Sequence, residues 1–475
     1  MDWSNAVEYE LARQVLQRGI AAVYLIAFLS TCAQFRPLLG ENGLLPVPDF
    51  LARAGRLAGP TLFRRWYSDR LLMLVAIVGA AISGVLVLGL PQLGPPWVPL
   101  IAFGLIWFGY LSIVNVGQTF YGFGWESLLV EAGFLAAFLG SNQTAAPALV
   151  IWLFRWLVFR LEFGAGMIKM RGDRSWRDLT ALYYHHETQP MPNRASRFAY
   201  RLPRPIHRLE VLGNHFAQLI VPFFLFAPQP IAAIAAAIVL VTQAWLVFTG
   251  NFAWLNVLTM VLAFSAVSDP VAHLAVSVIP ATWNTPDTMP IWFLVLVLAV
   301  TAFYLVLSYW PARNLLSQHQ LMNASFNRWH LCNAYGAFGS VTKTRYEVII
   351  EGTDAAQPDE DAAWLAYEFK GKPGDPARRS RQFAPYHLRL DWLMWFLALG
   401  SPDSRWFQVF LIRLLEADPA TLRLLRIDPF HGRPPRWVRA RLFHYRFATR
   451  HELRERRLWW IRTPTTVLVP PVGLG

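Results

Sequence analysis

Three ionisable residues recur at intervals of seven in one of the most apolar stretches of the chain. Arg155, Glu162 and Lys169 all lie within residues 146–170. Seven residues make nearly two turns of an α-helix, so the three side chains should form one stripe, with about 10 Å between neighbours. A charge at the centre of a bilayer costs on the order of 3 kcal/mol, and such groups therefore turn toward protein or water. The stripe predicts a polar wall inside a membrane-spanning helix bundle.

Two interpretations of this wall differ in what the charges do. Glu126 and Glu131 are predicted partners for Arg155 and Arg160, which would make the wall a set of ion pairs that fixes the geometry of the bundle. The alternative is an intramembrane cavity that binds a lipid headgroup, a peptide or a reacting group. Lys169 lies near the helix end, where its amine can also reach the membrane surface.

Further polar groups follow on later segments. His215 and Gln218 are three residues apart and should share a helix face. We predict either that His215 lines the same cavity or that it is a hydrogen-bonded core residue. The run Asn251–Asn256 is predicted to line the cavity or to cap the spans beside it.

An unusually polar and aromatic run, Tyr183–Asn193, comes directly after the stripe. Adjacent histidines do not share a helix face, and the run lacks the HExxH spacing of a zinc site, so no metal site is predicted. The run is either a structured loop that packs over the mouth of the bundle or a source of acid–base or ligand contacts. The residues that would make such contacts are His185, His186, Glu187, Gln189 and Asn193.

The composition is that of a membrane protein. Of 475 residues, 55% are hydrophobic and only 15% are charged, against about 25% charged in soluble domains. The net charge of +13 is spread over loops between apolar spans, so it indicates membrane orientation and not a nucleic-acid partner. The acidic, polar N-terminus does not resemble a cleavable signal peptide.

Basic residues and cysteines add two expectations. Of the 43 basic residues, 39 are arginine, a bias that indicates a GC-rich and therefore bacterial genome. Lysine occurs only at positions 169, 343, 370 and 372, so Lys169 is the only lysine in the membrane region. Cys32 and Cys332 lie far apart and form no metal or disulfide framework.

Apolar segments predict a polytopic helical bundle in residues 1–310. A spanning helix needs about 20 apolar residues, and nine segments qualify or nearly qualify. They lie near 17–34, 71–92, 97–114, 126–141, 146–170, 211–227, 230–249, 252–268 and 290–310. The fourth and eighth are short enough to be tilted or re-entrant.

The loops between these spans differ in charge. Eight arginines lie between Arg171 and Arg208 and six between Arg36 and Arg70. The loops 93–96, 142–145, 228–229 and 269–289 contain no lysine or arginine. The positive-inside rule therefore places the basic side, with the C-terminal region, in the cytoplasm.

After residue 310 the composition changes to that of an extramembrane domain. Alternating or β-branched stretches predict strands at Tyr346–Thr353, Trp364–Lys370 and Trp437–Phe447, and apolar faces predict helices at Asp391–Leu399 and Trp406–Glu416. The predicted fold class is therefore a mostly α membrane bundle of about nine transmembrane helices, joined to an α+β domain at residues 311–475. Its many arginines and tryptophans suit contact with anionic membrane lipids or with the bundle.

Motifs of common enzyme classes are absent from the sequence. It contains no GxSxG nucleophile elbow, no Walker loop and no GxGxxG, which argues against a serine hydrolase and against a nucleotide-driven pump. No cofactor is expected, and a non-enzymatic role is favoured.

Several long motifs occur in a fixed order along the chain. They are GAGMIKMRGDRSWRDLTALYYHHETQPMPN from Gly164, GNFAWLNVLTMVLAF from Gly250, WHLCNAYGAFGSVTKTRYEVIIEGT from Trp329, RQFAPYHLRLDWLMWF from Arg381, and DPF followed by PRWVRARLFHYRF from Asp428. In sequence and order they resemble the lipase maturation factor family, over nearly the whole chain.

This resemblance implies a multi-span membrane protein that helps secreted lipases, or another exported client, to fold and assemble in a chaperone-like way. In vertebrate members it implies an endoplasmic reticulum location, with a lumenal C-terminal domain that engages clients. For this chain, a bacterial cell membrane is the expected location.

A shorter similarity suggests a different activity. The sequence AGMIKM followed by Trp176 resembles a pattern of the vitamin K-dependent carboxylase and HTTM group, in which a lysine at the position of Lys169 acts as a base. The resemblance implies, as the alternative function, a membrane-embedded enzyme in which Glu162 and Arg155 organise a lipid-facing or quinone-facing cavity around Lys169.

Overall fold

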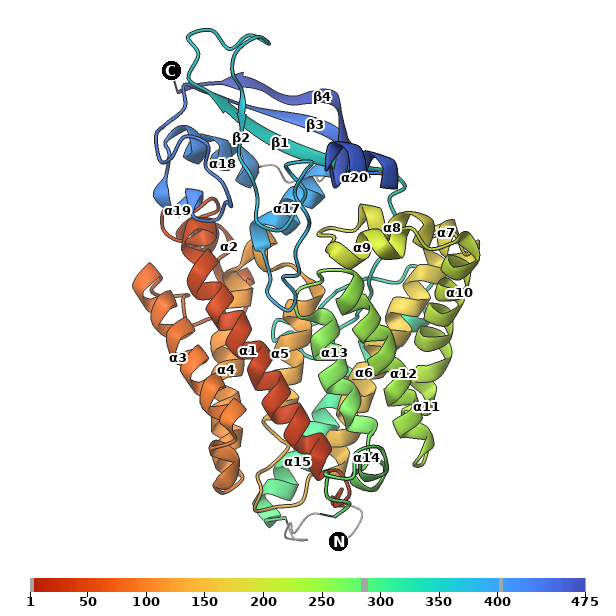
Figure 1. The fold of residues 1–475 in the computed structure, drawn as a ribbon. Helices are drawn as coiled ribbons and strands as arrows, with labels where there is room; N and C mark the ends of the chain where they lie inside the picture. The colour runs from red at the N-terminus through yellow and green to blue at the C-terminus, as the bar shows by residue number, and fades with distance from the viewer. Residues whose placement is uncertain (1–3, 283–288, 401–404, 475) are drawn as a thin grey trace.

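A computed structural model describes residues 4–282, 289–400 and 405–474. The first two thirds of the chain form a bundle of helices, and a sheet with short helices covers one end of it (Figure 1). The N-terminus lies at the opposite end of the molecule from this sheet.

The long helices of the bundle lie close to the segments predicted from the apolar runs. They are α1 (Glu10–Leu39), α3 (Asp69–Leu88), α4 (Trp97–Val116), α5 (Gly124–Ala136), α6 (Ala148–Arg171), α10 (Arg204–His215), α12 (Ile231–Thr249), α13 (Leu255–Ala263) and α15 (Ile291–Leu307). Shorter helices connect or extend them: α2 (Val47–Ala54), α7 (Arg174–Arg177), α8 (Leu182–Thr188), α9 (Arg194–Tyr200), α11 (Val221–Phe224), α14 (Asp269–Ala275) and α16 (Tyr309–Leu316).

Only some of these helices can cross a bilayer on length and composition alone. Within the described ranges, five helices qualify, at Glu10–Leu39, Asp69–Leu88, Trp97–Val116, Ile231–Thr249 and Ile291–Leu316, and a sixth is gained if the bent pair α13–α14 is one span. The predicted number of nine is therefore not confirmed. Helix α5 has only 13 residues, and α6 carries the charged stripe.

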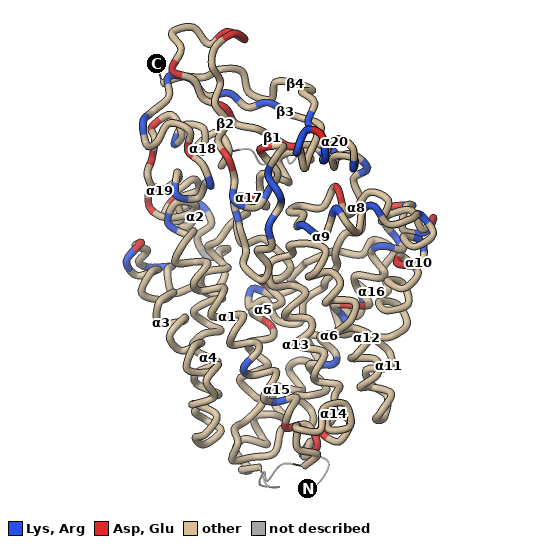
Figure 2. Tube along the Cα trace, in the orientation of Figure 1, with Lys and Arg blue, Asp and Glu red and all other residues tan. Residues whose placement is uncertain are grey.

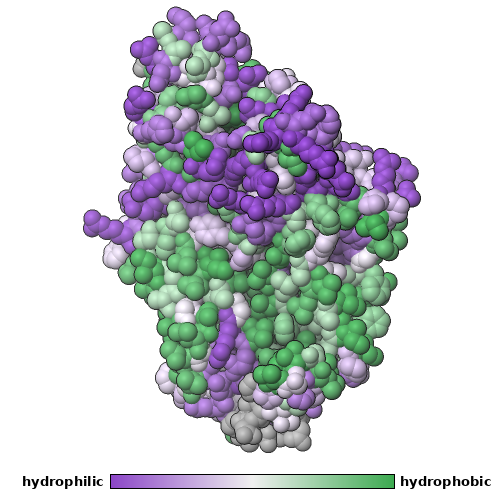
Figure 3. All heavy atoms as spheres, viewed as in Figure 1, coloured by the Kyte–Doolittle hydropathy of each residue, from purple (hydrophilic) through white to green (hydrophobic). Residues whose placement is uncertain are grey.

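The surface agrees with insertion in a membrane. The side of the bundle in Figure 3 is predominantly hydrophobic, and hydrophilic residues cover the end that carries the sheet. Lysines and arginines also gather at that end (Figure 2). The two arginine-rich loops and the C-terminal domain thus lie on one side, as predicted from the charge pattern. Residues 283–288 of the loop 269–289, which contains no lysine or arginine, lie outside the described residues.

The C-terminal sheet has four antiparallel strands in the order β2-β1-β3-β4. They are β1 (Arg345–Thr353), β2 (Leu365–Ala366), β3 (Trp437–Phe447) and β4 (Trp460–Val472). Strands β1 and β3 are confirmed predictions, whereas only two residues of the predicted strand 364–370 pair as β2. Strand β4 was not predicted, because its prolines argue against a strand; they are tolerated here because β4 is an edge strand with register shifts.

Four helices complete the C-terminal part. They are α17 (Arg389–Ala398), α18 (Arg405–Leu415), α19 (Pro419–Leu422) and α20 (Arg450–Arg456). Helices α17 and α18 confirm the two predicted from apolar faces. Helix α17 lies between the sheet and the bundle (Figure 1), and its start is buried among bundle helices.

The segment that leads into α17 is interlocked with α1. The Gln34 side chain donates a hydrogen bond to the His387 carbonyl (2.7 Å) and accepts one from the Arg389 backbone N–H (3.0 Å). The Asn251 side-chain oxygen likewise accepts from the backbone N–H groups of Phe383 (2.6 Å) and Ala384 (2.8 Å). Buried backbone groups of the C-terminal domain are therefore satisfied by bundle side chains.

Candidate functional site

A cavity of about 610 Å³ lies between α6, α10, α12 and α13 and is closed by α8 and residues 337–338. Its lining is mostly apolar, with polar side chains gathered in two groups. The polar lining residues include Glu162, Lys169, His185, His186, Glu210, Asn214, Gln218, Gln243 and Asn256. Two members of the predicted stripe, Glu162 and Lys169, therefore do face a common cavity.

Lys169 is buried in the cavity wall, which favours its place in the polar wall over the alternative of an amine that extends to solvent. Only 5% of the residue is exposed. Its ammonium donates to the side-chain oxygens of Asn214 (3.0 Å) and Gln218 (2.7 Å) and lies 4.8 Å from the centre of the Trp176 ring. Two acceptors and an aromatic face stabilise the charged form of the amine.

Glu162 is held by amides instead of by a cation. Its carboxylate accepts hydrogen bonds from Gln218 (3.2 Å) and Gln243 (2.6 Å). Asn256 donates in turn to Gln243 (2.6 Å). Gln218 thus bridges the two charged residues, because its oxygen accepts from Lys169 and its nitrogen donates to Glu162. This chain of amides forms one continuous polar wall.

Arg155 belongs neither to this wall nor to an ion pair with Glu126. Its guanidinium donates to the Ser265 carbonyl (2.9 Å) and lies over the rings of Tyr9 (5.1 Å) and Trp152 (5.0 Å). The predicted pairing with Glu126 is wrong, because Glu126 pairs with Arg389 of the C-terminal domain instead.

The pair Arg160–Glu131 is confirmed, with both side chains fully buried. Its surroundings come from the C-terminal part of the chain. The Glu131 carboxylate also accepts from the Asn333 side chain (2.9 Å) and the Tyr335 hydroxyl (2.8 Å), and Arg160 donates to the Asn333 carbonyl (2.7 Å). The approach is close because of Gly164, where an added Cβ would lie 2.5 Å from the Tyr335 carbonyl oxygen.

The run Tyr183–Asn193 packs over the mouth of the bundle, as predicted, but residues 182–188 form the helix α8 and not a loop. Gln189 donates to the Thr249 carbonyl (2.9 Å), Asn193 caps α9, and the Glu187 carboxylate accepts from the Phe447 backbone N–H (2.9 Å). Gln189, Asn193 and Glu187 therefore hold this segment in place over the mouth of the bundle, whereas His185 and His186 line the cavity. Burial lowers the pKa of His185 to about 3, so it is uncharged at neutral pH.

His215 is a hydrogen-bonded residue beside the cavity and not part of its lining. Its Nε2 lies 3.0 Å from the Trp176 carbonyl oxygen. The predicted common face with Gln218 is disrupted by a π-helical turn at Phe216–Ile220, which rotates Gln218 away from His215. The structure thus supports a hydrogen-bonded but only half-buried His215, and its assignment to the cavity is wrong.

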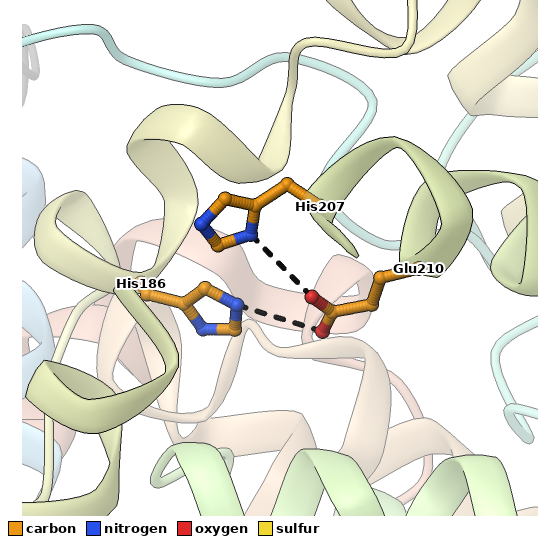
Figure 4. Close-up of side chains that lie close together, drawn as sticks. All are labelled: His186, His207 and Glu210. Carbon is orange, nitrogen blue, oxygen red and sulfur yellow. Dashed lines mark ion pairs between the residues drawn. The ribbon is translucent and has the colours of Figure 1, made fainter. Parts of the chain in front are cut away.

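His207 and Glu210 are site residues that were not predicted. They lie three residues apart on α10, on the same face, and meet His186 from α8 (Figure 4). The His186 Nε2 is 3.5 Å and the His207 Nδ1 is 3.6 Å from the nearest Glu210 oxygen. On a helix, the HxxE spacing places both side chains on one face. The sequence does not reveal the third member of the group, His186, because it comes from α8 and is brought beside them only by the fold.

Together, these features define an integral membrane helix bundle with a C-terminal α+β domain locked into it and a polar-walled cavity. Two family models match it: the lipase maturation factor transmembrane domain over residues 11–274, and the lipase maturation factor C-terminal domain over residues 331–470. The chain belongs to the lipase maturation factor family.

Curated relatives match over nearly the whole chain. Lipase maturation factor 1 of Homo sapiens is 38% identical, over 98% of this chain and 88% of its own length. The Bos taurus protein of the same name is 39% identical, over 99% and 90%. Lipase maturation factor 2 of Homo sapiens is 29% identical, over 98% and 83%. No solved structure matches the chain.

Proposed function

We propose that this chain is a membrane-integral maturation factor that assists the folding or assembly of secreted lipases. The end-to-end similarity to proteins named lipase maturation factors carries the proposal. The chaperone-like role suits a chain in which both family domains are held together by buried contacts. We propose the domain limits 1–310 and 311–475, and nine membrane passages in which α5 and α6 are shielded by the longer spans and α10–α11 forms an outer passage with an exposed apolar face.

The test is a deletion of the gene in its own host. Activity and mass of each secreted lipase are measured in the medium, and their ratio is expected to fall for at least one lipase and to recover when the wild-type chain is supplied. An unrelated polytopic membrane protein expressed at the same level is the control. An unchanged ratio for every secreted lipase contradicts the proposal.

The cavity is proposed to hold a membrane lipid, with an acyl chain along the apolar lining and a headgroup at the polar wall. Lining residues Leu209, Phe216 and Val241 are also 64%, 48% and 70% exposed on the outside of the bundle, which supports an opening toward the bilayer between α10 and α12. Besides their hydrogen bonds within the wall, the Gln218 and Gln243 amides each keep one N–H and one oxygen lone pair for a headgroup.

Native mass spectrometry of the detergent-purified protein is expected to show one bound lipid. Ala165, which lines the cavity and is 5% exposed, offers a filling variant: Ala165→Leu should lose the lipid because the added carbons occupy the space. Ala102→Leu, on α4 and away from the cavity, should keep it. Equal lipid in both variants, or none in the wild type, contradicts lipid binding in this cavity.

Orientation decides which surface meets a client. The charge pattern predicts a cytoplasmic C-terminal domain, whereas the family resemblance implies an exported one. The C-terminal end carries a folded domain with a four-stranded sheet, whereas the described residues at the opposite end form only loops and short helices such as α14. The proposed function therefore requires the C-terminal end to face the compartment in which lipases fold. We propose this orientation, in a bacterial cell membrane as the arginine-rich composition indicates.

Two single-cysteine variants test the orientation in a background without Cys32 and Cys332. Glu360, with a side chain 77% exposed, lies on the C-terminal domain, and the exposed Gln143 lies at the other end. An impermeant maleimide should label Glu360→Cys in intact right-side-out vesicles and Gln143→Cys only after permeabilisation. The reverse pattern would show that the positive-inside rule holds and that the domain is cytoplasmic.

A further inference from the structure

Three side chains from α8 and α10 direct unpaired atoms toward one another beside the cavity. His186 and His207 are each 2% exposed, and the Glu210 side chain is 18% exposed. Among the described residues, neither ring nitrogen of His186, nor the His207 Nδ1, nor the Glu210 Oε2 has a hydrogen-bond partner. One donor atom from each residue falls in a group whose members all lie within 4.8 Å of one another. Buried polar atoms without partners are uncommon in folded proteins.

The second contacts of these residues determine which atoms carry lone pairs. The His207 Nε2 lies 3.4 Å from the Tyr200 carbonyl oxygen and donates its proton there. In the neutral ring the Nδ1 is then an acceptor, and it faces a Glu210 oxygen, also an acceptor, at 3.6 Å. Two acceptors at this distance in a buried site require a positive species between them, either a proton or a metal ion.

The geometry suits a metal ion. Two imidazole nitrogens and one carboxylate oxygen are a common ligand set for zinc, and tetrahedral bonds of 2.0–2.1 Å place the ligand atoms roughly 3.3 Å apart. The His186 Nε2 lies 3.5 Å from the Glu210 Oε1, and the His207 Nδ1 lies 3.6 Å from the Glu210 Oε2. One donor atom from each residue lies within 4.8 Å of the other two, so a bound ion would draw the three side chains closer together. The carbonyl behind His207 and the Trp245 indole N–H that donates to Glu210 are outer contacts of the kind that orient metal ligands.

We propose that His186, His207 and Glu210 bind one zinc ion, with the fourth coordination position directed to the cavity. Two of the three ligands, His186 and Glu210, line that cavity, so water or a polar ligand there can complete the tetrahedron. The ion joins α8, which covers the mouth, to α10, which forms its side. The site is independent of whether the client is a lipase.

Zinc binding to the full-length protein tests the site. Protein purified without a histidine tag and stripped with a chelator is dialysed against buffered zinc, and bound metal is counted by mass spectrometry. We expect one ion per chain, with affinity lowered at least tenfold in His207→Gln and in Glu210→Gln. His451→Gln removes the exposed His451–Glu455 pair, the matched surface candidate, and should leave the stoichiometry unchanged.

Cobalt substitution and a ligand exchange separate a metal site from loss of folding. Cobalt in the wild type should give the intense visible absorption of a tetrahedral centre, and His207→Cys should retain one ion and shift the spectrum with a thiolate band. The His207→Gln and His207→Cys variants must both elute from size-exclusion chromatography as monodisperse protein. A wild type that binds no zinc above the level of His207→Gln would show that a proton fills the gap, and would overturn the proposal.

Discussion

Replacing Arg389 with methionine is expected to destabilise the folded protein by about 3–5 kcal/mol, because it leaves a buried carboxylate without its cation. Arg389 and Glu126 are both fully buried and joined at 2.5 Å. The guanidinium also donates to the Phe120 carbonyl (2.9 Å) and lies 3.5 Å from the centre of the Tyr121 ring. The residue that anchors the C-terminal domain is thus placed inside the membrane bundle.

Thermal unfolding in detergent, followed by tryptophan fluorescence, measures this effect. Arg413→Met is the matched control in the same domain: its pair with Glu416 is partly exposed, so a change of about 1 kcal/mol or less is expected. The double variant Glu126→Met with Arg389→Met should recover much of the loss, since both charges are then removed. An Arg389→Met midpoint equal to that of Arg413→Met would show that the pair does not hold the domain in place.

Arg160→Met should have the second large effect, again about 3–5 kcal/mol, because Glu131 then remains buried without a cation. Both side chains are 0% exposed. Arg155 provides the comparison from the same helix, since it donates to a carbonyl oxygen and has no carboxylate partner among the described residues. Its replacement by methionine removes a charge-assisted hydrogen bond and should cost about 1.5–3 kcal/mol.

The two variants are compared at equal expression by melting temperature and by the fraction recovered as monodisperse protein. Adding Glu131→Gln to Arg160→Met should raise the melting temperature above that of the single variant, whereas adding Glu126→Gln to Arg155→Met should not, because those residues are not paired. Rescue in the second combination would contradict the partner assignment in the structure.

The sequence was sufficient to place the elements whose signals are local. The apolar runs predict the helices, and the spacing of Glu162 and Lys169 predicts a shared polar wall. The predicted partner of Arg155, Glu126, was wrong, because the spacing within each helix does not show which residues of two neighbouring helices lie at the same level. Strand β4 was missed because its prolines are tolerated only at a sheet edge, which the local sequence does not reveal.

The parts of the site that could not be predicted are those assembled from distant segments. His207 and Glu210 can be recognised as part of a site only when the fold places His186 of α8 beside them. Gln218 and Gln243 have no local pattern that distinguishes them from other amides on apolar helices, yet they bridge the charges in the cavity wall. Likewise, no spacing rule relates Glu126 to Arg389, which are 263 positions apart.

That separation has a consequence for biogenesis. At a translation rate of about 5–20 residues per second, the cation for Glu126 emerges tens of seconds after α5 itself. During this interval the newly made bundle carries a carboxylate without its Arg389 partner. The bundle can close only when the chain has been synthesised past residue 389 and this segment has packed against it. A transcript with a premature stop anywhere before codon 389 therefore yields a polypeptide that cannot finish assembly. Such products are natural substrates for membrane quality control, however complete their spanning helices are.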